Sequence, residues 1–191
     1  MTHTQTARNS LVNIRTVIPT IQLDIRYATT NNFTGKQVYP CAECFLHVEA
    51  AQALKKVQEE LQLQGLSLKI FDGYRPLSVQ KIFWNLVPDP RYVADPKKGS
   101  RHNRGCAVDV TLTKIDGTAL IMPTEFDDFT ECAHAHYPKV SPEVAHNRAL
   151  LQTVMTRHGF EIMETEWWHF DFKDWRNYPI LDISFDQLIT T

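Results

Sequence analysis

One apolar segment with an acidic residue inside it restricts the fold of this chain more than any other feature. From Cys106 to Thr113 the residues alternate as in a β-strand, with Ala107, Asp109 and Thr111 on one face and valine and leucine side chains on the other. A buried carboxylate without a partner is energetically costly. We therefore expect a buried strand on which Asp109 meets a polar or charged partner.

Helix and strand patterns surround this segment without regular alternation. Apolar spacing predicts helices over residues 49–64, 77–86 and 142–158, and strand patterns cover residues 17–28, 66–71, 160–163 and 166–172. The irregular order favours an α+β fold over a doubly wound α/β fold. We expect one compact domain over residues 1–191, with a mainly antiparallel central sheet, flanking helices, and residues 1–16 as an N-terminal extension.

Charge and hydropathy exclude several classes of protein. The 191 residues contain 20 Lys and Arg against 22 Asp and Glu, a formal net charge of −2, which provides no basic surface for nucleic acid. No apolar run approaches the ~18–20 residues of a membrane span. The polar start, MTHTQTARNS, does not resemble a signal peptide. We expect a cytoplasmic protein, and a periplasmic one only if a signal was removed before the numbering begins; the sequence does not predict its oligomeric state.

The four cysteines do not form a recognisable site. Cys41 and Cys44 make a C-x-x-C pair, but Cys106 and Cys132 do not supply the second pair of a structural zinc site. No strand pattern precedes the pair, as a thioredoxin-like motif requires. We expect ordinary thiols, with a local disulfide as the alternative in an oxidising compartment.

Metal-compatible residues gather at two places far apart in the chain. His102 ends a long loop and Asp109 lies in the strand just after Gly105, so both side chains could reach one ion, while His169 could supply a third ligand. Three such ligands with one open position suit a catalytic zinc. Glu166 is the candidate general base. Residues 166 and 169 point to opposite faces of a regular strand, so a bulge, a strong twist or a position of Glu166 just before the strand is required.

Arg75 follows an Asp-Gly turn and precedes Pro76, at the end of a strand. Its guanidinium could stabilise an oxyanion or bind a substrate carboxylate, and the residues alone do not separate these roles. Single histidines and arginines are more often structural. From spacing alone, a zinc hydrolase and a set of structural residues both remain open.

The same residues carry a resemblance to a known family. The S-x-H-x-x-G-x-A-x-D pattern occurs from Ser100 to Asp109, and E-x-x-H occurs as EWWH. Supporting stretches are LDIRYATTNNFTG, KIFDGYRP, YVADP, HFDF and the F-D segment FDDF at residues 126–129. The chain resembles the D-alanyl-D-alanine dipeptidase family, the VanX-type zinc enzymes, over roughly residues 21–172. The resemblance implies the α+β fold of zinc D,D-peptidases, which the hedgehog signalling domain shares.

The resemblance also implies roles for individual residues. It implies that His102, Asp109 and His169 bind one zinc ion per chain, that Glu166 is the catalytic base and that Arg75 steadies the transition state.

Three further residues are implied as substrate contacts. An acidic residue of the F-D segment is implied to hold the substrate ammonium, which maps to Asp127, with Asp128 as the alternative. Ser100 and Tyr27 are implied as further contacts. Cys106 departs from the family pattern inside the metal motif, where its thiol could respond to oxidation.

Together these features predict a zinc metallopeptidase that hydrolyses the dipeptide D-Ala-D-Ala, with this small molecule as its partner. Two alternatives remain. One is a D,D-carboxypeptidase acting on longer peptidoglycan stem peptides, and the other is a non-catalytic, hedgehog-like zinc-binding module.

Overall fold

A five-stranded sheet forms the centre of the molecule in a computed structural model that describes residues 11–190. Its order is β2-β4-β5-β7-β6, with bounds Gln22–Leu23 (β2), Leu66–Asp72 (β4), Ala107–Lys114 (β5), Phe160–Met163 (β6) and Glu166–Phe172 (β7). Only β2 and β4 are parallel among these neighbours; the other three pairs are antiparallel. The predicted α+β fold with a mainly antiparallel sheet is confirmed.

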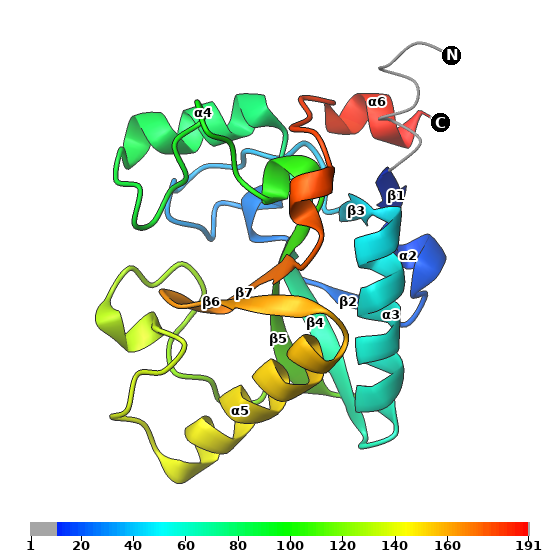
Figure 1. Cartoon of the computed structure of the whole chain (residues 1–191), viewed down its shortest axis with the longest axis vertical. Coiled ribbons are helices and arrows are strands. Elements are labelled where there is room, and N and C mark those ends of the chain that lie inside the picture. Colours follow the sequence, from blue (N-terminus) through cyan, green and yellow to red (C-terminus); the bar gives the residue numbers. More distant parts are fainter. Residues whose placement is uncertain (1–10, 191) are drawn as a thin grey trace.

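Two long helices cover one side of this sheet. Figure 1 shows α3 (Val48–Gln62) and α5 (Pro142–Arg157) along one side, and α4 (Leu77–Leu86) with long loops along the other. The Ser141 side chain accepts a hydrogen bond from the backbone of Val144 and so caps the start of α5. All three helices lie where the apolar spacing predicts them.

The chain between residues 11 and 17 belongs to the folded unit. β1 (Leu11–Asn13) pairs antiparallel with β3 (Phe45–His47), and α2 (Ile14–Val17) follows directly. Leu11 and Ile14 are buried in the core. The expected N-terminal extension of residues 1–16 is therefore wrong from residue 11 onward, because these apolar side chains pack against β3; residues 1–10 lie outside the described residues.

The strand expected over residues 17–28 is also mostly wrong. Only the two residues of β2 pair with β4, and the segment continues as a 3-10 turn, η1 (Arg26–Ala28). Further short elements are η2 (His102–Arg104), η3 (Glu131–Ala133), η4 (Trp175–Asn177) and α6 (Phe185–Ile189). Within the described residues, no helix combines the length and the apolar character needed to span a membrane.

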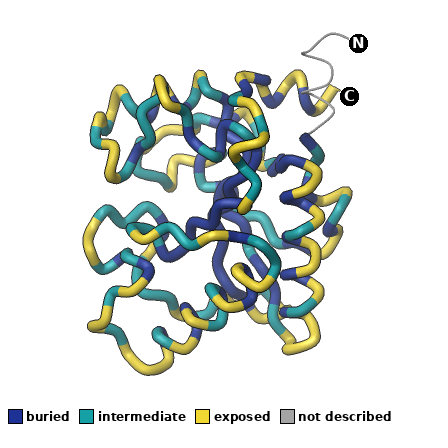
Figure 2. Tube along the Cα trace, viewed as in Figure 1, coloured by how far each residue is buried: buried dark blue, intermediate teal, exposed yellow. Residues whose placement is uncertain are grey.

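The two faces of β5 separate the core from the polar residues. Val108, Val110 and Leu112 are fully buried in the apolar core, and Figure 2 shows the buried chain running through the central strands. Because side chains alternate along a strand, Asp109 and Thr111 lie on the opposite face. A polar site can therefore form on the face that α4 and the long loops cover.

Candidate metal centre and substrate cavity

Three neighbouring strands bring acidic and imidazole side chains into one row. In the strand register Asp72 of β4 is opposite Asp109 of β5, and Asp109 is opposite His169 of β7. His102 enters from η2, whose final turn is closed by Gly105 with a φ of +66°. This positive φ is readily available only to glycine, and it lets the chain turn from the His102 loop into β5.

The predicted metal ligands converge on one point. His102 Nε2 lies 3.4 Å from Asp109 Oδ1, His169 Nδ1 lies 3.0 Å from the same oxygen, and the two nitrogens are 3.2 Å apart. A tetrahedral zinc with bonds of ~2.0–2.1 Å needs ligand separations of ~3.3 Å. All three side chains are buried, and Asp109 Oδ1 makes no hydrogen bond of acceptable geometry with any described residue. These residues fit a zinc ion.

Outer hydrogen bonds orient the two imidazoles. His102 Nδ1 lies 2.7 Å from the backbone oxygen of Gly73, and His169 Nε2 lies 2.9 Å from Asp171 Oδ1. Such partners fix the tautomer and direct the other ring nitrogen toward a metal. Sequence reasoning missed Asp171, although its position two residues after His169 on one strand face was a usable signal.

An irregular pairing in β7 places Glu166 beside His169. Ile162 of β6 pairs with Phe170, but the next residue, Met163, pairs with Glu166, so β7 contains three extra residues. Glu166 Oε2 consequently lies 3.6 Å from His169 Nδ1. The expected strand irregularity is confirmed. Burial raises the pKa of the Glu166 carboxyl to about 7, before any metal charge acts on it.

Arg75 is buried and rigidly held. Its Nε and Nη2 donate to Asp72 Oδ2 at 3.1 and 2.7 Å, and its Nη1 donates to Gln80 Oε1 at 2.9 Å. The guanidinium also packs over the rings of Tyr27 and Phe83. Sequence reasoning missed Asp72 and Gln80; Asp72 belongs to the FDGYRP stretch, whereas Gln80 gives no sequence signal beyond lying on a helix.

Asp127 and Asp128 have different surroundings. The Tyr27 hydroxyl donates to Asp127 Oδ1 at 3.0 Å, while Asp127 Oδ2 is buried and has no hydrogen-bond partner among the described residues. Burial, followed by the negative charge of Asp109, raises the pKa of Asp127 to about 8. Asp128 instead accepts a hydrogen bond from the backbone of Thr130 and does not line the cavity.

A cavity of about 300 Å³ joins these groups, at the small end of ligand cavities. The predicted site residues all line it: Tyr27, Arg75, Ser100, His102, Asp109, Asp127, Glu166 and His169. The four cysteines are free thiols, and none of them lines it. The structure thus brings together residues from η1, the end of β4, the His102 loop, β5, β7 and the loop before η3.

Comparisons with known proteins identify the family of this chain. A family model described as D-Ala-D-Ala dipeptidase, of the M15 peptidases, matches residues 7–186. The chain belongs to the D-Ala-D-Ala dipeptidase family. Both sequence-based predictions, of this family and of a metallopeptidase, are thereby confirmed.

Relatives of this D-Ala-D-Ala dipeptidase family align over nearly their full length. A D-alanyl-D-alanine dipeptidase of Escherichia coli (strain K12) is 41% identical over 180 residues, 94% of this chain and 93% of that protein. One from Enterococcus faecium is 33% identical, with 85% of this chain and 91% of that protein aligned.

Two solved structures are partly similar to this family member. A vancomycin-resistance D,D-pentapeptidase, VanY, in complex with Zn(II) has a TM-score of 0.46 at 16% identity, covering 68% of this chain and 74% of that one. The LD-carboxypeptidase LdcB has the same TM-score at 21% identity, covering 70% and 63%.

Proposed function

We propose that this chain hydrolyses D-Ala-D-Ala to two D-alanine molecules, with one zinc ion held by His102, Asp109 and His169. The observation that carries the proposal is the buried, unpartnered Asp127 Oδ2 in the same small cavity as the three converging ligand atoms. A carboxylate in the same small cavity as the three ligand atoms suits a substrate whose ammonium is one residue from the cleaved bond.

The reaction requires a water molecule and a polarised carbonyl. When bound, zinc acts as a Lewis acid toward the scissile carbonyl and lowers the pKa of a water molecule. Glu166, 3.6 Å from His169, accepts the proton of the attacking water and later delivers it to the leaving amine. Both steps require Glu166 to face the same point as the ligands, which the irregular pairing of β7 achieves.

Arg75 supplies fixed positive charge to the oxyanion of the tetrahedral intermediate. Its contacts with Asp72 and Gln80 use three of its five N–H groups, so two N–H groups remain for the developing charge. Because the guanidinium is already held in place, it needs little reorganisation during the reaction.

The substrate termini decide which peptides fit. Asp127 binds the ammonium, and Tyr27 holds the Asp127 carboxylate through its hydroxyl. Ser100 lies at the entrance to the His102 loop and lines the same cavity. A blocked amino terminus would bury Asp127 without its counter-charge, which is costly.

The decisive experiment compares D-Ala-D-Ala, N-acetyl-D-Ala-D-Ala and a D-Ala-D-Ala-terminated pentapeptide, each with and without a chelator. We expect hydrolysis of the dipeptide only, loss of activity with the chelator and recovery with added zinc. Efficient cleavage of the pentapeptide but not of the dipeptide would overturn the proposal in favour of a D,D-carboxypeptidase.

A variant of the base tests the non-catalytic alternative. In a hedgehog-like binding module Glu166 is dispensable, and Glu166→Gln would leave every property of the zinc-loaded protein unchanged. We expect this variant to keep zinc but to lose at least about 100-fold in kcat, the usual scale of general base catalysis.

A further inference from the structure

Three arginines line the substrate cavity, and their hydrogen bonds distinguish them. Arg75 is held by Asp72 and Gln80, as described above. Arg91 forms a two-point pair with Asp89, with Nε–Oδ1 at 3.0 Å and Nη2–Oδ2 at 2.6 Å, and its side chain is 72% exposed. Arg101 is the third, and it has no comparable partner for its two terminal nitrogens.

Arg101 forms an ion pair through its Nε, which makes no hydrogen bond of acceptable geometry within residues 11–190, and its guanidinium packs by its flat face on an aromatic ring. Nε lies 3.3 Å from Asp171 Oδ2, and the guanidinium carbon lies 4.8 Å from the centre of the Trp175 ring. Within residues 11–190, Nη1 and Nη2 make no hydrogen bond. The cation is therefore paired at its base, while its two NH₂ groups have no partner among these residues. Arg101 lines the substrate cavity and, like Ser100, also a neighbouring cavity.

The neighbouring Ser100 offers a second donor at the same wall. Its Oγ accepts a hydrogen bond from the backbone nitrogen of His102 at 3.2 Å, and its hydroxyl proton remains available. A hydroxyl beside a guanidinium is a donor set that matches a carboxylate. Asp127 is held by Tyr27, whereas Arg101 rests on Asp171 and Trp175, so the negative and positive ends of the cavity have separate supports.

We propose that Arg101, with Ser100, binds the C-terminal carboxylate of the substrate. The assignment rests on the proposed dipeptidase function and adds the group that recognises the second end of the zwitterion. It predicts that a free carboxylate on the second residue is required for tight binding. The sequence left two roles open for Arg75, oxyanion stabilisation and carboxylate binding. With the carboxylate bound by Arg101, the role of Arg75 is to stabilise the oxyanion.

A different role for Arg101 would give a different result. Because Asp171 also contacts His169, Arg101 could act only by positioning Asp171 and through it the metal ligand. Loss of such a positioning contact would lower kcat and zinc content for any substrate. Loss of a carboxylate contact would raise KM, and only for substrates that carry the carboxylate.

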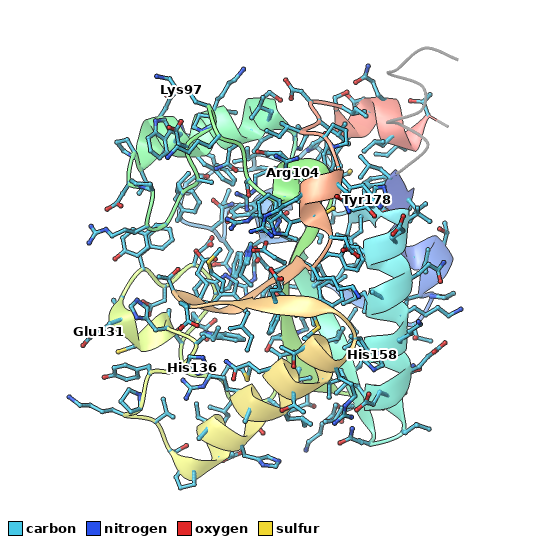
Figure 3. All side chains as sticks on the ribbon, viewed as in Figure 1. Lys97, Arg104, Glu131, His136, His158 and Tyr178 are labelled. Carbon is cyan, nitrogen blue, oxygen red and sulfur yellow. The ribbon has the colours of Figure 1, made fainter. Side chains whose placement is uncertain are left out.

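The test compares D-Ala-D-Ala with D-alanyl-D-alaninamide on zinc-loaded wild type, Arg101→Met, Arg101→Lys and the control Lys98→Met. Lys98 lines a second cavity of about 410 Å³ beside Arg101 but not the substrate cavity. Arg104 is unsuitable as a control because it donates a hydrogen bond to the Tyr178 carbonyl. Figure 3 labels Arg104 and Tyr178.

We expect Arg101→Met to raise the KM for the dipeptide by about 10- to 100-fold with little change in kcat, and to leave kcat/KM for the amide unchanged. Arg101→Lys should recover part of the loss, and Lys98→Met should behave as wild type. If Arg101→Met lost equal kcat/KM on both substrates, or if wild type cleaved both substrates at equal rates, the proposed role of Arg101 would be overturned, while the proposed dipeptidase function would stand. A wild type that cleaves neither substrate would overturn the proposed function as well.

Discussion

At the scale of single residues, Asp127 lowers the stability of the folded chain and provides a binding group for an ammonium. Its φ of +63° lies in the left-handed region, which aspartate and asparagine tolerate better than most residues. Its carboxyl is buried with one oxygen unpaired, so the folded chain must hold a group that would be better solvated in the unfolded chain. A bound ammonium supplies the missing partner.

This burial predicts a pH-dependent cost in the metal-free protein. The pKa of Asp127 rises from 3.8 to about 8 through burial and the charge of Asp109, with Glu166 acting in the same direction and Tyr27 and Arg75 opposing. Between these two pH values the folded chain keeps a proton that the unfolded chain has lost. The contribution of Asp127 to the free energy of unfolding therefore falls as pH rises, by at most ~1.4 kcal/mol per pH unit.

The variant Asp127→Asn removes this titration and suits the same φ. We expect it to be more stable than wild type in urea unfolding with chelator present, by a margin that grows from pH 4 to pH 8, while kcat/KM for D-Ala-D-Ala falls by about 10- to 100-fold. Parallel pH profiles for the two proteins would mean that Asp127 is already ionised in the folded chain.

At the scale of elements, the passage from the His102 loop into β5 depends on Gly105. A Cβ at this position would lie 2.5 Å from Leu11 Cδ2 and 2.8 Å from the backbone nitrogen of His47. That nitrogen donates to the Gly105 carbonyl at 2.8 Å. The β1–β3 pair is therefore packed directly against the turn that carries a metal ligand.

Gly105→Ala should destabilise the chain more than the left-handed backbone alone explains. Gly35 is the matched control, because its φ of +64° is nearly the same and a Cβ there would meet no atom within 4 Å. We expect Gly35→Ala to lower the free energy of unfolding by about 1 kcal/mol, and Gly105→Ala by roughly twice that or more, with weaker zinc binding. Urea unfolding measures the first quantity and competition with a chelator the second; equal losses in both variants would contradict this account.

Most elements could be predicted from the sequence, whereas their irregular connections could not. The apolar spacing of α3 reflects its one-sided burial, and the alternation of β5 reflects one apolar and one more polar face, although both faces of β5 are buried. Both patterns could therefore be recognised in the sequence. The β1–β3 pair joins residues 32 to 36 positions apart through three-residue strands, which leave too short a pattern to detect.

The residues of the site also divide into those that the sequence predicts and those that it does not. The convergence of His102, Asp109 and His169 could be predicted because their residue types and spacing are characteristic of metal ligands. Asp72 and Gln80 act through contacts that only the folded chain creates, since Asp72 faces Arg75 by way of a bulge between Ile70 and Asp72.

At the scale of the whole molecule, the three proposed ligands lie on segments that are far apart in the chain. They come from η2, β5 and β7, which are 67 residues apart at the extremes. An ion that binds only the folded chain stabilises it in proportion to the logarithm of its concentration. Metal binding should therefore stabilise the whole domain and not only the cavity.

Zinc at one hundred times its dissociation constant should add about 3 kcal/mol, which for a chain of this size is roughly 5–10 °C in Tm. His169→Ala should lose this shift. His136→Ala should retain it, because His136 lies at the surface beside Glu164, with 63% of its side chain exposed; Figure 3 labels His136. A calorimetric scan with and without zinc measures the shift, and an unshifted wild type would argue against a metal held by these three elements.

The two irregular strand pairings have a consequence for protein engineering. One inserts Phe71 before Asp72, and the other adds three residues to β7 between Glu166 and Phe170. Copying the reactive side chains onto a regular antiparallel sheet would aim the base and the guanidinium away from the ligands, however faithful the residue types. A design that copies this site into another protein must therefore also copy the two irregular strand pairings. Loop redesign in the present chain should leave those two pairings unchanged.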